Sequence, residues 1–208
     1  MEITMGHERR QSGHFSTIVG LMKINTMRTI ITFLFMIAAM GLSAQDAFTA
    51  STVTMTLDGS SNIHDWTSTA GEVKVTGVFK GENGRLTAID QLVVTVPVKK
   101  IKSTKGSIMD NKTYDALRAS KFPNITFKAT EVSINGDQFK ATGTLTIAGK
   151  YRTVTILAKG KAVTGGYEIS GSYDLKMSQF DIERPTALMG TVATTDDVKV
   201  YFAVRLKR

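Results

Sequence analysis

The side chains that could take part in catalysis are few and scattered. His64 is followed by Asp65 and Trp66, and it is the single histidine after residue 44. Adjacent residues of a strand point to opposite faces, so His64 and Asp65 are not expected to act as a pair. The chain has 0 cysteines, which excludes thiol catalysis, cysteine metal ligands and disulfides. Transition metals need several nitrogen or sulfur ligands, so we expect no metal site.

The acidic residues do not form a convincing catalytic pair either. Asp181 with Glu183, and Asp196 with Asp197, fall in predicted loops or strand ends, where carboxylates serve turns and solvation. No sequence resembles the sharp strand-to-helix turn that presents a nucleophilic serine. We therefore expect no catalytic residues, no catalytic cofactor and no enzymatic activity.

The charge of the chain limits its partners. The formal net charge is +8, but no basic stripe alternates with aromatic residues, so nucleic-acid binding is not expected. One cluster of lysines, at positions 99, 100, 102 and 105, leaves open a transient contact with an anionic membrane surface. The sequence also leaves a homodimer open.

The elements that must position any site are strands. Apolar and polar residues alternate along Phe139–Ile147, Tyr167–Met177 and Val198–Leu206, which predicts strands with one buried face. Weaker runs are Thr52–Leu57, Val73–Lys80, Leu92–Ile101, Ile125–Ser133 and Arg152–Lys159, with Ile63–Ser68 as an optional ninth. Short turns such as Asn135-Gly136 make neighbours antiparallel. We expect an all-β, eight-stranded antiparallel barrel rather than a sandwich, because closure removes the exposed edges.

One helical segment interrupts the strands. We expect a short amphipathic helix over Met109–Lys121, capped by Asp110 or Asn111 and ended by Pro123. Such a helix commonly lies over one mouth of a barrel. It could act there as a functional lid or simply cover apolar surface.

The N-terminal region predicts export. Met22-Lys23 and Met27-Arg28 precede an apolar run from Ile30 to Leu42, and the small residues Ser43-Ala44 follow. This order is typical of a signal peptide, which we assign to residues 22–44. Residues 1–21 are interpreted as a non-native or wrongly assigned upstream extension, and residues 45–208 as the barrel domain. The expected location is the bacterial periplasm or the exterior.

Several positions on the predicted inner face are small, which favours a dry internal space. They are Gly77, Ala129, Ala141, Gly143 and Gly171. The alternative is that they relieve crowding where strands bend. A Gly143→Leu substitution is expected to destabilise a filled core, whereas a hollow barrel should tolerate it and lose ligand uptake.

Two central motifs resemble those of the YceI-like family. The first is YDALRASKFPNITF at residues 114–127, where a helix ends and a strand begins, and the second is ATGTLTIAGKYRTV at residues 141–154. Met177–Asp181 and Val198–Val200 resemble its last motifs, so the likeness covers nearly all of residues 45–208. The chain departs from the family pattern in the direct adjacency of Phe122 and Pro123, and in SNIHDW at residues 61–66. The resemblance implies a lipocalin-like barrel, exported to the periplasm or beyond, that binds polyisoprenoids or prenyl quinones inside.

The expected function is therefore binding, with transport or storage, of a long-chain amphiphilic isoprenoid or prenyl quinone in the barrel interior. The alternative is a structural or interaction barrel with a filled core and no ligand. The candidate lining residues are Trp66, Phe79, Phe127, Leu145, Ile147, Tyr173, Phe180 and Phe202. Tyr114, Leu117 and Phe122 are expected at the entrance, and His64, Asn111 and Asp181 near the head group of the ligand.

Overall fold

The structure is a computed structural model that describes residues 45–187 and 190–208. The signal peptide expected at residues 22–44 and the upstream extension at residues 1–21 lie outside the described residues. All of the described residues belong to the expected barrel domain.

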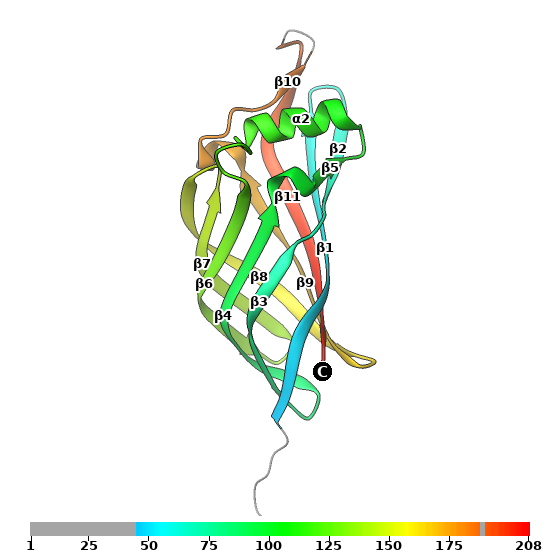
Figure 1. Cartoon of the computed structure of the whole chain (residues 1–208), viewed down its shortest axis with the longest axis vertical. Coiled ribbons are helices and arrows are strands. Elements are labelled where there is room, and N and C mark those ends of the chain that lie inside the picture. Colours follow the sequence, from blue (N-terminus) through cyan, green and yellow to red (C-terminus); the bar gives the residue numbers. More distant parts are fainter. Residues whose placement is uncertain (1–44, 188–189) are drawn as a thin grey trace, which may run out of the picture. The chain divides into compact units, whose positions relative to one another are not determined.

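Eight long strands close into a barrel (Figure 1). Each pairs antiparallel with its neighbours, and the pairing of the last strand with the first closes the ring. The strand order around the ring is β1-β3-β4-β6-β7-β8-β9-β11. This confirms the expected all-β, eight-stranded antiparallel barrel. The strands are β1 (Gln45–Ser61), β3 (Lys74–Glu82), β4 (Arg85–Pro97), β6 (Asn124–Asn135), β7 (Gln138–Ile147), β8 (Lys150–Val163), β9 (Gly166–Lys176) and β11 (Val192–Lys207).

Shorter elements extend one end of the barrel. The optional ninth strand is present as β2 (Asp65–Ala70), which pairs with the second half of β1, and β5 (Ile101–Ser103) pairs with β2. A small strand, β10 (Thr186–Ala187), pairs with the start of β11. Two 3-10 turns, η1 (Val98–Lys100) and η2 (Met177–Phe180), follow β4 and β9.

The alternation of the sequence sets the inner face of the barrel. Directly paired residues share a face, so Phe127 with Leu145, and Met55 with Phe202, bring apolar side chains together inside. Most of the alternate outward positions carry polar side chains, chiefly lysine, threonine and serine. The buried apolar side chains form clusters near the two ends of the barrel. The strands therefore bury one face around the interior, as the period of two predicts.

The helix α2 (Ser107–Ala116) is shorter than predicted and begins differently. Its N-cap is Gly106, at a φ of 89°, and neither Asp110 nor Asn111 caps it. The expected caps were wrong because the Asp110 carboxylate bonds to the preceding strand, where it accepts a hydrogen bond from the Ser103 amide at 2.7 Å. Turns continue the chain from the end of the helix to Lys121.

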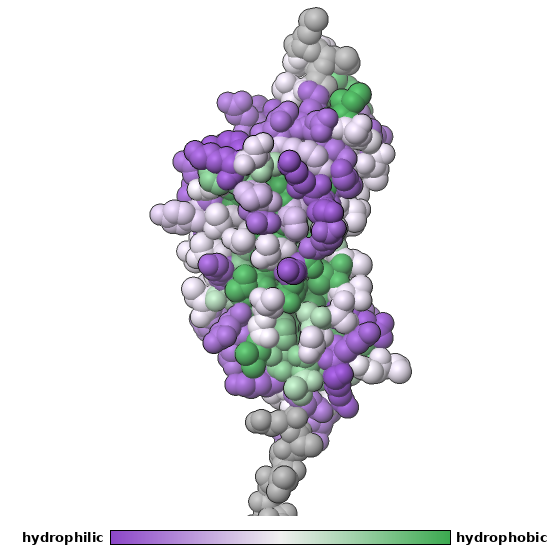
Figure 2. Space-filling view, viewed as in Figure 1, coloured by the Kyte–Doolittle hydropathy of each residue, from purple (hydrophilic) through white to green (hydrophobic). Residues whose placement is uncertain are grey.

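The barrel wall has a gap on one side. β1 pairs with β3 only over Gln45–Phe48 and with β2 only over Thr56–Ser60, so residues 49–55 have no strand beside them on that edge in the described part of the chain. The segment between β2 and β3 bonds to Lys100 instead, whose carbonyl oxygen accepts the Gly71 amide at 2.9 Å and whose ammonium pairs with Glu72 at 2.5 Å. Hydrophobic residues reach the surface at mid-height on this face (Figure 2).

Candidate functional site

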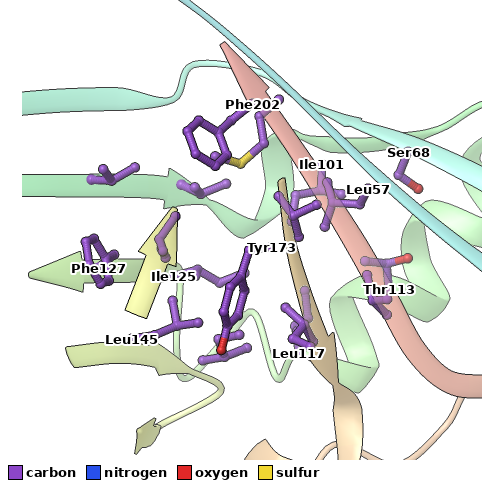
Figure 3. A pocket seen from close by; sticks show the side chains of 18 of the residues that line it. Leu57, Ser68, Ile101, Thr113, Leu117, Ile125, Phe127, Leu145, Tyr173 and Phe202 are labelled. Carbon is purple, nitrogen blue, oxygen red and sulfur yellow. The ribbon is translucent and has the colours of Figure 1, made fainter. Parts of the chain in front are cut away.

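The interior of the barrel contains a cavity of about 280 Å³. This volume lies near the lower end of the range for small-molecule pockets. Nearly all of its lining is hydrocarbon, and the side chains come from the barrel strands, from β2 and β5, and from α2 (Figure 3). An interior of this kind is contrary to the alternative of a completely filled core. The cavity suits an apolar ligand. A hydrocarbon lining cannot replace the hydrogen bonds that a polar ligand makes with water.

One face of α2 covers the upper end of the cavity. Met109, Thr113, Ala116 and Leu117 all line it, at spacings of three and four residues. Residues at these spacings share one side of a helix, and Figure 3 shows Thr113 and Leu117 directed into the cavity. The helix therefore separates the apolar interior from solvent at this end.

Polar contacts tie α2 to the barrel rim. The Tyr114 hydroxyl donates to the carbonyl oxygens of Lys99 at 3.0 Å and Ile101 at 3.1 Å. The Lys112 ammonium donates to the Thr186 carbonyl oxygen at 2.6 Å. Tyr114, which was expected at the entrance as a ligand contact, thus lies outside the cavity lining because its side chain points to the rim.

The attachment of α2 also depends on Asp110. The Ser103 amide, followed by the Lys102 ammonium at 3.0 Å, holds the pKa of this carboxyl below its ordinary value. A lowered folded-state pKa means that the contribution to stability is present above the unfolded-state pKa and is lost as the pH falls through the folded-state pKa. The helix should therefore loosen only in strongly acidic solution.

We expect the hydrogen-exchange protection factors of the Ser103 amide and of α2 to fall as the pH is lowered from about 5 to about 2. Asp110→Asn removes the titrating group and keeps an acceptor oxygen, so its protection should change much less over this range. Amide exchange measured by mass spectrometry provides the comparison. Equal pH dependence in the two proteins would contradict the assigned role of Asp110.

The lower end of the cavity is closed by large side chains. Phe79 and Phe139 line the cavity there. Behind them are Phe48, Tyr167 and Leu206, which are 5%, 1% and 0% exposed. Because these residues fill the base, the cavity is a pocket below α2 rather than a pore.

Most of the predicted lining residues do surround the cavity. They come from six strands and from the C-cap of α2, and closure of the sheet is what brings them together. They are Trp66, Phe79, Leu117, Phe127, Leu145, Ile147, Tyr173 and Phe202.

Two predicted aromatic residues lie elsewhere. Phe180 is 1% exposed and packs in the upper core cluster, where η2 turns it away from the cavity while Met177 of the same turn lines it. The Phe122 ring packs over Gly149, and the charged groups of Arg118 and Lys121 lie over it at 5.2 and 5.5 Å. It therefore covers the β7–β8 turn rather than the entrance.

The three head-group candidates are exposed and do not line the cavity. His64 lies in the β1–β2 turn, where its carbonyl oxygen accepts a hydrogen bond from the Ser61 hydroxyl at 2.8 Å. Asn111 is on the outer side of α2. Asp181 pairs with Lys150 at 2.6 Å, and this contact lowers the pKa of the carboxyl. Their residue types suggested head-group binding, but their positions serve turns and surface charge.

A further group of lining residues was not predicted from the sequence. The strand residues among them follow the same alternation, and Thr113 lies on the cavity-facing side of α2. They include Met55, Ser68, Val75, Ile89, Thr113, Ala158 and Val204.

Within residues 45–187 and 190–208, no group of three or more histidine, cysteine or acidic side chains is placed to hold a metal ion. Among these same residues, no helix is long and apolar enough to cross a bilayer.

Sequence comparison finds a match over nearly the whole described domain. The YceI-like domain family matches residues 45–206. A UPF0312 protein of Pseudomonas aeruginosa is 44% identical over 75 residues, which are 33% of this chain and 39% of that protein. A UPF0312 protein of Yersinia pestis is 36% identical over 72 residues, or 32% and 38% of the two chains. The matched segments thus span well under half the length of these relatives.

Solved structures share the fold. Burkholderia cenocepacia BcnA superposes with a TM-score of 0.60 at 19% identity, covering 74% of this chain and 95% of that one. The Campylobacter jejuni YCEI protein gives 0.56 at 23% identity, over 68% and 84%. A polyisoprenoid binding domain from Saccharophagus degradans gives 0.57 at 10% identity, over 79% and 98%. At these identities the likeness establishes the barrel fold.

Proposed function

The chain belongs to the YceI-like domain family, and from this we propose that its barrel binds the apolar chain of an isoprenoid lipid non-covalently. The observation that carries the proposal is the cavity of about 280 Å³ with an almost wholly hydrocarbon lining. The polyisoprenoid binding domain from Saccharophagus degradans, which has the same fold, supports the choice of ligand class.

Burial of the chain supplies the binding free energy. Each 100 Å² of apolar ligand surface removed from water contributes about 2.5 kcal/mol. Apart from the gap beside β1, the wall is already formed by hydrogen-bonded strands, so little ordering of the protein opposes binding. Side chains such as Phe127, Leu145 and Phe202 provide contact area without demanding a partner for a polar group.

The proposal extends to where the protein works. The basic, apolar and small-residue order of residues 22–44 supports export, and a carrier or store for lipid would then operate in the periplasm or outside the cell. Transport or storage, rather than catalysis, is the role that follows from a pocket lined by hydrocarbon.

Lipid extraction from protein purified from its native host tests the proposed function. We expect an isoprenoid lipid at near-stoichiometric amounts by mass spectrometry. An Ala141→Trp variant, whose added side chain would occupy the cavity, should carry far less when purified in the same way. Recovery of only substoichiometric detergent from the unmodified protein would overturn the proposal.

A further inference from the structure

Four cationic side chains gather around the turn between β7 and β8, which lies at the α2 end of the barrel (Figure 1). Lys150 and Arg152 belong to the start of β8, and Arg118 and Lys121 belong to the turns that follow α2. Tyr151 stands between the two β8 cations in the sequence, and its side chain is exposed. We refer to these five residues as the turn patch.

Contacts across the fold hold the two segments of the turn patch together. The Arg118 guanidinium donates to the Ala148 carbonyl oxygen, at the tip of the β7–β8 turn. The Phe122 ring packs against Gly149 of the same turn, and the charged groups of Arg118 and Lys121 lie over that ring. The cations therefore gather at one place although they come from separate parts of the sequence.

Most of the charge on the turn patch is not neutralised. Lys150 pairs with Asp181, whereas Arg118, Lys121 and Arg152 have no ion pair with any residue of 45–187 or 190–208. Asp181 responds to this excess of positive charge. Its bond to Lys150, together with the nearby Arg152 and Arg118, holds the pKa of the carboxyl below its ordinary value.

The lysine cluster at positions 99, 100, 102 and 105 is less available to an anionic partner. Lys100 pairs with Glu72 at 2.5 Å, and Lys102 pairs with Asp110 at 3.0 Å. Two of its four charges are therefore matched by carboxylates. The turn patch has the larger unpaired charge, and it also carries an exposed aromatic ring.

Tyr151 suits the boundary between water and lipid. Its side chain is 72% exposed, although it directly follows the turn and pairs with Thr146 on β7. A tyrosine ring combines an apolar body with a hydroxyl that stays hydrated, and such rings are enriched at membrane surfaces. Neighbouring residues of a strand point to opposite faces, so Tyr151 and the pair Lys150 and Arg152 flank the tip of the hairpin on its two sides. A surface that meets the tip end-on can contact both sides.

The turn patch adjoins the end of the cavity that α2 covers. Leu117 directly precedes Arg118, and Ile147 directly precedes the β7–β8 turn. Both Leu117 and Ile147 line the cavity. A surface held against the turn patch would therefore lie beside the upper end of the pocket.

We propose that the turn patch docks the barrel on the surface of a bilayer that carries anionic lipid head groups. The cations attract the head groups, and the Tyr151 ring enters the interface. Docking at this place would bring the α2 end of the cavity to the membrane, which is the store of any lipid that the barrel binds. The docking surface itself does not depend on which ligand the cavity takes.

Sedimentation with vesicles tests the proposal. We expect binding to vesicles of phosphatidylglycerol and phosphatidylcholine in equal parts, and little binding to phosphatidylcholine alone. Raising the salt from about 0.1 M to about 1 M shortens the Debye length from about 10 Å to about 3 Å, so it should release most of the protein. The double variant Lys121→Glu with Arg152→Glu should bind more than about tenfold more weakly, because two attractive charges become repulsive. Tyr151→Ser should weaken binding by about three- to tenfold.

The matched control is the double variant Lys140→Glu with Lys159→Glu. These two lysines are exposed on the same strands, β7 and β8, at the end away from the turn. The control therefore makes the same change in net charge at another place, and it should weaken binding by less than about twofold. Circular dichroism establishes that each variant is folded.

Three results would overturn the proposal: no binding to the anionic vesicles, equal binding to both kinds of vesicle, or equal losses in the two double variants. Soluble polyglutamate tests the competing class of partner. If it bound as tightly as the anionic vesicles, and Tyr151→Ser had no effect on either, the partner would be an acidic macromolecule and the membrane proposal would fail. The assay measures docking rather than lipid uptake, so none of these results would bear on the proposed function.

Discussion

Replacement of Ala141 by tryptophan is expected to abolish lipid binding while the barrel stays folded. Ala141 lies on β7 between Val132 and Ile156, and its side chain lines the cavity. An indole at this position would extend into free space rather than into packed neighbours. It would therefore remove the volume that the ligand needs without forcing the strands apart.

The Ala141→Trp substitution should weaken lipid binding by more than about tenfold, which corresponds to about 1.4 kcal/mol of binding free energy. A ligand present at 100 times its dissociation constant stabilises the native state by about 2.7 kcal/mol, and the variant should lose most of the matching rise in Tm. Lys140→Trp is the control, since it adds the same side chain to the exposed face of the same strand. If the ligand raised the Tm of the Ala141→Trp variant as much as that of the unmodified protein, the ligand would have to bind elsewhere.

A Gly143→Leu substitution should destabilise the protein by about 1–3 kcal/mol or more. A Cβ atom at Gly143 would fall on the Lys128 carbonyl oxygen and within 2.6 Å of the Ala129 Cα atom. Both belong to the backbone of β6, beside an irregularity between Ala129 and Glu131. Backbone atoms in a hydrogen-bonded ladder cannot move aside as a side chain can. The expectation that a hollow barrel tolerates this substitution is therefore wrong.

Ala141→Leu is the matched comparison, two residues away on the same inner face. Because Ala141 borders the cavity, the larger leucine side chain should lower the free energy of unfolding by less than about 1 kcal/mol. Urea unfolding of the two variants measures the difference. Similar losses of stability in both would mean that the interior near Ala141 is as closely packed as the contact between β6 and β7.

The small inward residues show why sequence alone could not locate the cavity. All five occupy inward positions, as the alternation predicts, yet Ala141 is the one that lines the free space. Gly171 faces the Leu157 carbonyl oxygen, and Gly77 faces that of Asp90. At Gly143, Gly171 and Gly77 the missing side chain accommodates a neighbouring strand rather than a ligand. The contacts across the sheet decide between these outcomes.

Local signals were sufficient for the barrel itself. Alternation with a period of two and short turns determine which residues face inward and which strands are antiparallel neighbours. These signals identified the apolar lining residues Phe127, Leu145 and Phe202 because inward direction is a local property of a strand. The resemblance to the YceI-like family added the expected ligand class, and the family match to residues 45–206 confirms membership.

Tertiary structure alone decided how the inward residues meet. The start of α2 at Gly106 and the turn that directs Phe180 away from the cavity both depend on contacts between distant segments. Strand register and irregular pairings set these contacts, and their free energies arise from packing that no single segment contains. The sequence by itself therefore determined a closed barrel with an apolar interior, whereas the position of the free space emerged only when the strands were brought together.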